Sequence, residues 1–165
     1  MTVLVAVASK YGATREIAEA IGRTLAEGGV EPLVMPADEV DGVAAFEAVV
    51  LGSAVYTGRW LEPARRLAEE CADEFAARPT WLFSSGPIGS PPRPVPEESV
   101  QVDDLLAATS AREHRVFAGK LDKSRLSFPE KALVIAFRVK DGDFRDWDEI
   151  AAWAAGIAAV LRPHS

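Results

Sequence analysis

Hydrophobic and polar positions along the chain form two kinds of pattern that follow one another. Short apolar runs are typical of strands buried on both faces, because a half-exposed strand would alternate apolar and polar residues. Stretches with an apolar residue every third or fourth position are typical of helices packed on one side. The expected strands are 3–8, 31–35, 48–52, 80–84 and 114–119, and the expected helices are about 13–27, 61–77, 100–109 and 147–161.

This succession predicts an open parallel sheet with helices on both faces. Pro32 would remove a ladder hydrogen bond from the strand at 31–35, so that strand is expected at a sheet edge. Right-handed crossovers then give the strand order 2-1-3-4-5. We therefore expect one domain over 1–165, an α/β/α sandwich of three layers, in which only 120–145 has no place in the scheme.

The loop 9–14 lies between the first apolar strand and the first helix. Its backbone N–H groups and the positive end of the helix would face the same space, which suits a phosphate. Ser9 and Thr14 would add hydroxyl donors, and Gly12 would let the backbone close around the anion. The alternative is an ordinary strand-to-helix connection with a Ser or Thr cap.

Two related phosphate loops are excluded by the residues themselves. The loop has no G-x-G-x-x-G, so the dinucleotide fingerprint is absent. It also has no G-x-x-x-x-G-K-[ST], because Lys10 precedes the glycine. The remaining interpretation is a hydroxyl-rich loop for a single phosphate.

Composition narrows the classes of partner. A net charge of −7 argues against nucleic acid and against adsorption to anionic lipid, and it suits contact with basic patches on redox partners. Cys71 is the single cysteine and cannot form an intrachain disulfide, so we expect the protein to reside in a reducing cytoplasm. No apolar run approaches the length of a membrane span, and no His/Cys cluster has the spacing of metal ligands.

Three loops are expected at the crevice where the strand order reverses, outside the carboxyl ends of the strands. They are 9–14, 53–60 and 84–89. The second loop carries Tyr56 and Trp60, and the third is small and rich in backbone donors. Together they could hold a phosphate and flank a flat heterocycle, although each aromatic could instead pack on its own helix.

In this order and spacing, the Ser-x-x-Gly-x-Thr, Gly-Ser-Ala-x-Tyr-x-Gly and Ser-Ser-Gly-Pro loops resemble the flavodoxin superfamily. More narrowly, 52–54, 56–58 and the following Trp-x-x-Pro-Ala resemble the branch containing the menaquinone-dependent protoporphyrinogen oxidases, enzymes of heme biosynthesis. Many flavodoxins have a threonine where this chain has Tyr11, which could instead reach the ribityl chain or shield the phosphate.

The resemblance implies FMN as cofactor. Its phosphate would lie against the first loop, one side of its ring against the second, and the other side against the third. The residues implied are Ser9, Lys10, Tyr11, Gly12, Ala13 and Thr14 for the phosphate end, Ser53, Ala54, Tyr56, Thr57, Gly58 and Trp60 for one side of the ring, and Ser84, Ser85, Gly86, Pro87 and Gly89 for the other.

The segment 120–145 is apolar and basic within an acidic chain. The quinone-dependent oxidases carry an insertion in the same area, so the resemblance implies a wall for a quinone or a porphyrinogen-like substrate. A helix at about 129–140 would suit that role and leaves peripheral membrane contact open. The alternative is a helix that simply packs on the sheet.

Three functions remain open. The first is an FMN-dependent oxidoreductase of the protoporphyrinogen IX dehydrogenase type, in which the flavin carries the chemistry and no side chain stands out as a general acid or base. The second is a flavodoxin-type electron carrier with protein redox partners. The third is a flavodoxin-like module that has lost its flavin.

Overall fold

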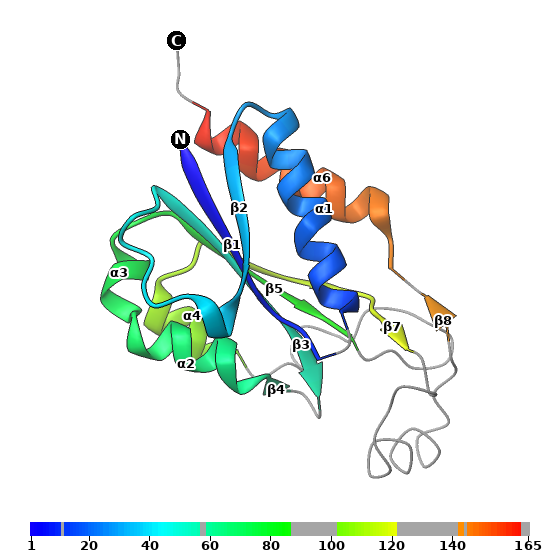
Figure 1. Ribbon diagram of the computed structural model, residues 1–165, viewed down its shortest axis with the longest axis horizontal. Coiled ribbons are helices and arrows are strands. Elements are labelled where there is room, and N and C mark those ends of the chain that lie inside the picture. Colours follow the sequence, from blue (N-terminus) through cyan, green and yellow to red (C-terminus); the bar gives the residue numbers. More distant parts are fainter. Residues whose placement is uncertain (11, 57–58, 87–101, 122–141, 144, 163–165) are drawn as a thin grey trace.

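The computed structural model describes residues 1–10, 12–56, 59–86, 102–121, 142–143 and 145–162, with the backbone alone for residues 56, 120, 121 and 142. Five parallel strands form the sheet in the order β2-β1-β3-β5-β6, and β4 pairs antiparallel with β3 (Figure 1). This confirms the predicted fold class and strand order. The strands are β1 (Thr2–Ala8), β2 (Glu31–Pro36), β3 (Ala48–Tyr56), β4 (Arg59–Trp60), β5 (Thr80–Ser85) and β6 (Glu113–Phe117).

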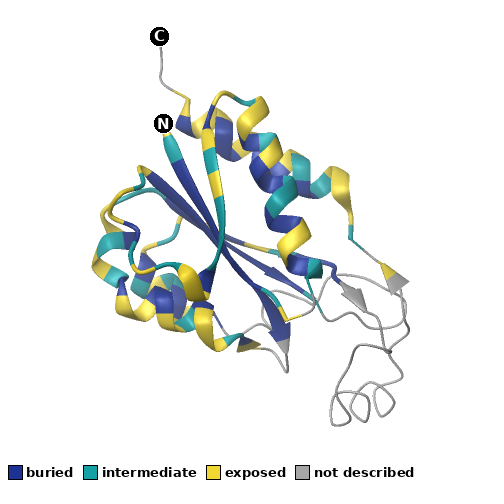
Figure 2. Cartoon of the chain, viewed as in Figure 1, coloured by how far each residue is buried: buried dark blue, intermediate teal, exposed yellow. Residues whose placement is uncertain are grey.

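Helices cover both faces of the sheet, and the central strands β1, β3 and β5 are buried over most of their length (Figures 1 and 2). The helices α1 (Ala13–Glu27) and α6 (Trp147–Leu161) lie on one face, and α2 (Glu62–Glu70), α3 (Ala72–Ala76) and α4 (Asp103–Thr109) lie on the other. A 3-10 turn, η1 (Ala37–Glu39), follows β2. No helix in the described part of the chain is long and apolar enough to cross a membrane.

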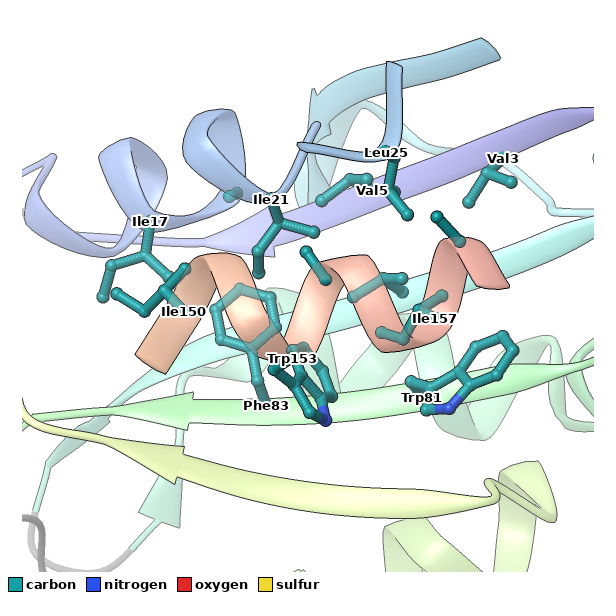
Figure 3. Close-up of a cluster of buried hydrophobic side chains, with 14 of the residues drawn as sticks. Val3, Val5, Ile17, Ile21, Leu25, Trp81, Phe83, Ile150, Trp153 and Ile157 are labelled. Atoms are coloured by element: carbon teal, nitrogen blue, oxygen red, sulfur yellow. The ribbon is translucent and has the colours of Figure 1, made fainter. Parts of the chain in front are cut away.

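The apolar run of β1 supplies both cores. Val3, Val5 and Val7 pack into the cluster under α1 and α6, which also holds the aromatic rings of Phe83 and Trp153 (Figure 3). The intervening residues Leu4, Ala6 and Ala8 pack into the cluster under α2, α3 and α4. Successive side chains of a strand point to opposite faces, so a strand between two helix layers needs apolar residues throughout.

The predicted ends of α1 and α6 are confirmed. At the end of α1, Gly29 has φ +90, and the N–H of Val30 donates to the carbonyl of Leu25 at 3.1 Å, a Schellman arrangement that satisfies the last carbonyls. At the start of α6, the carboxylate of Asp146 accepts the N–H of Glu149 at 3.1 Å.

Two predicted elements differ in the structure. The predicted loop from residue 53 is in large part a hairpin, because β3 continues to Tyr56 and Trp60 returns against Val55. The predicted helix over 61–77 is divided at Cys71, which has φ −111 and ψ 24. The predicted loop 85–98, beyond Gly86, and the predicted helix at 129–140 lie outside the described residues.

The ends of the segment 120–145 are joined by a short antiparallel ladder. β7 (Lys120–Leu121) pairs with β8 (Gly142–Asp143). The two described ends of the segment, one after β6 and one just before α6, therefore lie side by side.

Candidate functional site

The strand register brings the three predicted loops to one edge of the sheet. Ala8 of β1 lies beside Ser53 of β3, and Ser53 lies beside Ser84 of β5. Ser85 in turn lies beside Phe117 of β6. Because these strands are parallel, the segments that follow them emerge side by side, on both sides of the point between β1 and β3 where the strand order reverses.

The first loop forms a cap-free start to α1. Gly12 has φ +89 and ψ −12, and its N–H donates to the Ser9 hydroxyl at 3.0 Å. No side chain caps α1. The N–H groups of Ala13, Thr14 and the next residue have no partner within the helix, because the first turn offers them none. An anion at this end of the helix could accept hydrogen bonds from these N–H groups.

Other residues of the first loop differ in accessibility. Lys10 is exposed, Ser9 is half-buried, and Thr14 is buried. A Cβ built on Gly12 would meet nothing within 4 Å, so the space in front of the loop is open and the glycine is required by its backbone conformation alone. Tyr11 lies outside the described residues.

The buried hydroxyl of Ser53 forms hydrogen bonds at the base of the second loop. Ser53 is fully buried, and its Oγ donates to the carbonyl of Ala54 at 2.8 Å and accepts the N–H of Leu61 at 3.0 Å. These bonds fix the hairpin of β3 and β4 to the start of α2. Tyr56 is described by its backbone, and Thr57 and Gly58 lie outside the described residues.

Trp60 is a core residue, which corrects the expectation that its ring would flank a ligand. It is 2% exposed and packs in the cluster under α2, α3 and α4. Its Nε1–H donates to the Ser84 hydroxyl at 2.7 Å. The short return strand β4 turns the indole towards the sheet interior, because Trp60 pairs with the buried Val55.

The third loop begins where β5 ends. Ser84 and Ser85 are buried, and Gly86 has φ +113 with its N–H donating to the carbonyl of Phe117 at 3.3 Å. Gly119 packs directly against this turn, since a Cβ there would lie 2.8 Å from the Cα of Gly86. Pro87 and Gly89 lie outside the described residues.

A buried polar chain links the second and third loops to β6. The Oγ of Ser84 lies 2.6 Å from Nε2 of His114, in addition to the bond that it accepts from Trp60. An indole N–H can only donate, so the serine O–H is available to donate to an unprotonated Nε2. The sequence alone assigned no role to His114; the pairing of β5 with β6 sets it opposite Leu82, from where its ring reaches Ser84.

Arg145 is a second residue that the sequence reasoning did not identify. Its side chain is 4% exposed and forms ion pairs with Asp143 at 2.6 Å and Glu16 at 3.1 Å. Hydrogen bonding to Asp143 raises the pKa of the guanidinium, burial lowers it, and Glu16 raises it again. The cation lies beside the first turn of α1, which is the phosphate end of the candidate site.

Among the described residues, no three side chains of His, Cys, Asp or Glu gather in a way that could hold a metal ion. The donors at the site are backbone N–H groups and hydroxyls, which suit an anionic organic ligand.

The fold and the site define a flavodoxin-like α/β protein. A family model described as "Flavodoxin domain" matches residues 4–147, and the chain belongs to that family. A search of curated proteins gives no match.

Solved structures share the fold at low sequence identity. A flavodoxin from the domain Archaea aligns over 97% of this chain and 98% of its own, with 19% identity and a TM-score of 0.65. Oxidised Flavodoxin 1 from Bacillus cereus aligns over 98% and 100%, with 16% identity and a TM-score of 0.66. Rubredoxin oxygen:oxidoreductase from Desulfovibrio gigas aligns over 97% of this chain and 36% of its own, with 12% identity and a TM-score of 0.63.

Proposed function

We propose that this chain binds FMN at the carboxyl edge of the sheet and acts in electron transfer. The observation that carries the proposal is the start of α1, where Gly12 has a left-handed backbone, its N–H is held by Ser9, and no side chain caps the helix. A helix start arranged in this way presents donors to an anion rather than to its own side chains.

The three loops would share the cofactor. Ser9, Lys10, Gly12, Ala13 and Thr14 would hold the phosphate. The second and third loops would hold the ring chiefly through backbone groups, because the hydroxyls of Ser53 and Ser84 are engaged within the protein. When bound, FMN would supply one- or two-electron transfer, and the protein would supply position and backbone donors for charge on the ring.

A pair of glycines tests the phosphate site with a matched control. Gly12 and Gly29 flank α1 with φ +89 and +90, and a Cβ on either would meet nothing within 4 Å. Alanine should therefore strain both positions alike, but only Gly12 is at the site. We expect Gly12→Ala to weaken FMN binding clearly more than Gly29→Ala, measured by quenching of FMN fluorescence.

The wild-type protein tests the proposal itself. It should be yellow when purified with added FMN and should quench FMN fluorescence at micromolar concentration. A colourless protein that leaves FMN fluorescence unchanged would refute the proposal and would favour a flavodoxin-like module without flavin.

For the reaction, we propose oxidation of a porphyrinogen-like substrate with a quinone acceptor, in the cytoplasm or at the inner face of the membrane. This finer proposal rests on the resemblance of 52–58 and of Trp60 to Ala64 to the protoporphyrinogen oxidase branch. The second candidate is a one-electron carrier. It is favoured by full-length alignment with structures described as flavodoxins and by the net charge of −7, which suits a basic protein partner.

Turnover separates the two candidates. The FMN-loaded protein should oxidise protoporphyrinogen with a menaquinone analogue in steady state. Absence of turnover, together with fast reduction of cytochrome c by the reduced protein, would reject the enzyme and support the carrier.

A further inference from the structure

Arg145 stands between β8 and α6, and four of the five N–H donors of its guanidinium have described acceptors. Its Nε and Nη2 donate to the two carboxylate oxygens of Asp143 at 2.8 and 2.6 Å. Its Nη1 donates to the carbonyl of Ala13 and to Oε1 of Glu16, each at 3.1 Å. Its Cζ lies 4.6 Å from the ring centroid of Trp147.

These contacts fix the guanidinium in one plane. The bidentate pair with Asp143 and the stack on Trp147 set its orientation, so Nη1 points at the first turn of α1. A lysine ammonium could not make the same set of bonds, because it is a point charge without a planar fork.

The charge of Arg145 is not explained by the stability of α1. A cation beside the amino end of a helix opposes the helix dipole. Glu16 and Asp143 offset that cost, so the two carboxylates and the carbonyl of Ala13 hold the guanidinium at this end of α1.

The same residue connects the two sides of the candidate site. Asp143 pairs with Lys120 in the ladder of β8 and β7, and Lys120 follows Gly119, which packs on Gly86 of the third loop. A path of described contacts therefore runs from the first turn of α1 through Arg145 to the turn at Gly86.

We infer that Arg145 is a positioning residue for the phosphate end of the site, holding the first turn of α1 in its anion-binding geometry and coupling it to the β7–β8 ladder. This inference rests on the proposed FMN function. Because coupling is reciprocal, phosphate bound at α1 should also stabilise the ladder.

Calorimetric titration with FMN and with riboflavin, which lacks the phosphate, tests the inference. Losing charged hydrogen bonds that order the cradle should weaken FMN binding about tenfold in Arg145→Ala and change riboflavin binding less than about twofold. Arg145→Lys should not restore FMN binding, because lysine cannot make the same set of hydrogen bonds. The control is Arg66→Ala, which removes an exposed ion pair to Glu62 on α2 and should leave both affinities unchanged.

Hydrogen exchange gives a readout that a general loss of stability would not produce. FMN should protect the amides of Leu121 and Asp143 in the wild type, and this protection should be lost in Arg145→Ala. Asp143→Asn, which keeps the arginine but weakens its fork, provides a second variant if Arg145→Ala does not fold, and it should show the same loss.

The possible outcomes test the role of Arg145 separately from the proposed binding of FMN. Equal weakening of FMN and riboflavin, or unchanged FMN binding, would overturn the role of Arg145 and leave FMN binding intact. If the wild type binds no FMN, the proposed function fails. Inorganic phosphate then tests Arg145 alone, through amide shifts of Ala13 and Thr14 that should weaken in Arg145→Ala; identical shifts would overturn the inference.

Discussion

Gly119 packs against the turn at Gly86, and we expect this close approach to position the third loop; replacing Gly119 with alanine tests that role. It follows β6 and is buried, and its φ is outside the left-handed region, so the effect of a methyl group is steric. The new Cβ would lie 2.8 Å from the Cα of Gly86, 3.0 Å from its N and 3.2 Å from the Oγ of Ser85.

The size of the effect follows from these distances. Carbon atoms pack best at about 3.5–4.0 Å, so the turn at Gly86 must move by several tenths of an ångström or more. Overpacking of this kind costs about 1–3 kcal/mol. Movement also strains the hydrogen bond from the Gly86 N–H to the carbonyl of Phe117, a bond worth about 1 kcal/mol. In the opposite direction, alanine reduces the conformational entropy of the unfolded chain, which stabilises the folded protein by about 0.5–1 kcal/mol. We expect a net loss of about 1–3 kcal/mol.

Urea unfolding of the FMN-free protein measures this loss, and Gly156→Ala provides the control. A Cβ on Gly156 meets nothing within 4 Å on the exposed side of α6, so alanine there should stabilise the protein by up to about 1 kcal/mol. FMN affinity should fall in Gly119→Ala and remain unchanged in Gly156→Ala. If Gly119→Ala were as stable as the wild type and bound FMN equally well, the close approach of Gly119 to Gly86 would not position the loop.

Three further predictions concern buried groups and a cap. Ser84→Ala should lower the free energy of unfolding by about 1–3 kcal/mol in urea, because Trp60 and His114 lose their shared hydroxyl partner. Burial, with the nearby carboxylates of Glu74 and Glu70, raises the pKa of the Cys71 thiol above its ordinary value, so iodoacetamide should alkylate the native protein far more slowly than the unfolded one. The stability linked to the protonated thiol should be complete below the ordinary thiol pKa and should be lost as the pH rises through the raised pKa of the folded state. Asp146→Ala should cost about 1 kcal/mol, seen as a lower Tm, because the first turn of α6 loses its cap.

The sequence predicted the elements whose signals are local. The apolar run of β1, the glycines after α1 and the Asp146 cap each act within a few residues, and the edge position of β2 follows from one proline. The hairpin of β3 and β4 was missed because Ser53 and Gly58 resemble loop residues, whereas the Ser53 hydroxyl finds partners inside the fold. No glycine or proline lies near Cys71 in the sequence to predict the break in the helix there.

The residues of the candidate site also differ in whether the sequence alone could predict their position. The unusual backbone of Gly12 could be expected from its place between strand and helix. The burial of Trp60 depends on a return strand that pairs it with Val55, and Arg145 contacts Ala13 across more than a hundred residues. Pairwise contacts of this range leave no periodic trace in a single sequence, so the three-dimensional arrangement alone identifies them.

The packing of α6 on α1 has a consequence for synthesis on the ribosome. Ile17, Ile21 and Leu25 lie opposite Ile150, Trp153 and Ile157 (Figure 3). One half of the interior therefore stays open until α6 has left the exit tunnel, whereas the half under α2, α3 and α4 is complete earlier. A nascent chain halted before residue 147 would lack α6 and would leave the apolar strand face beside α1 partly uncovered, so we expect it to bind chaperones that recognise emerging polypeptides.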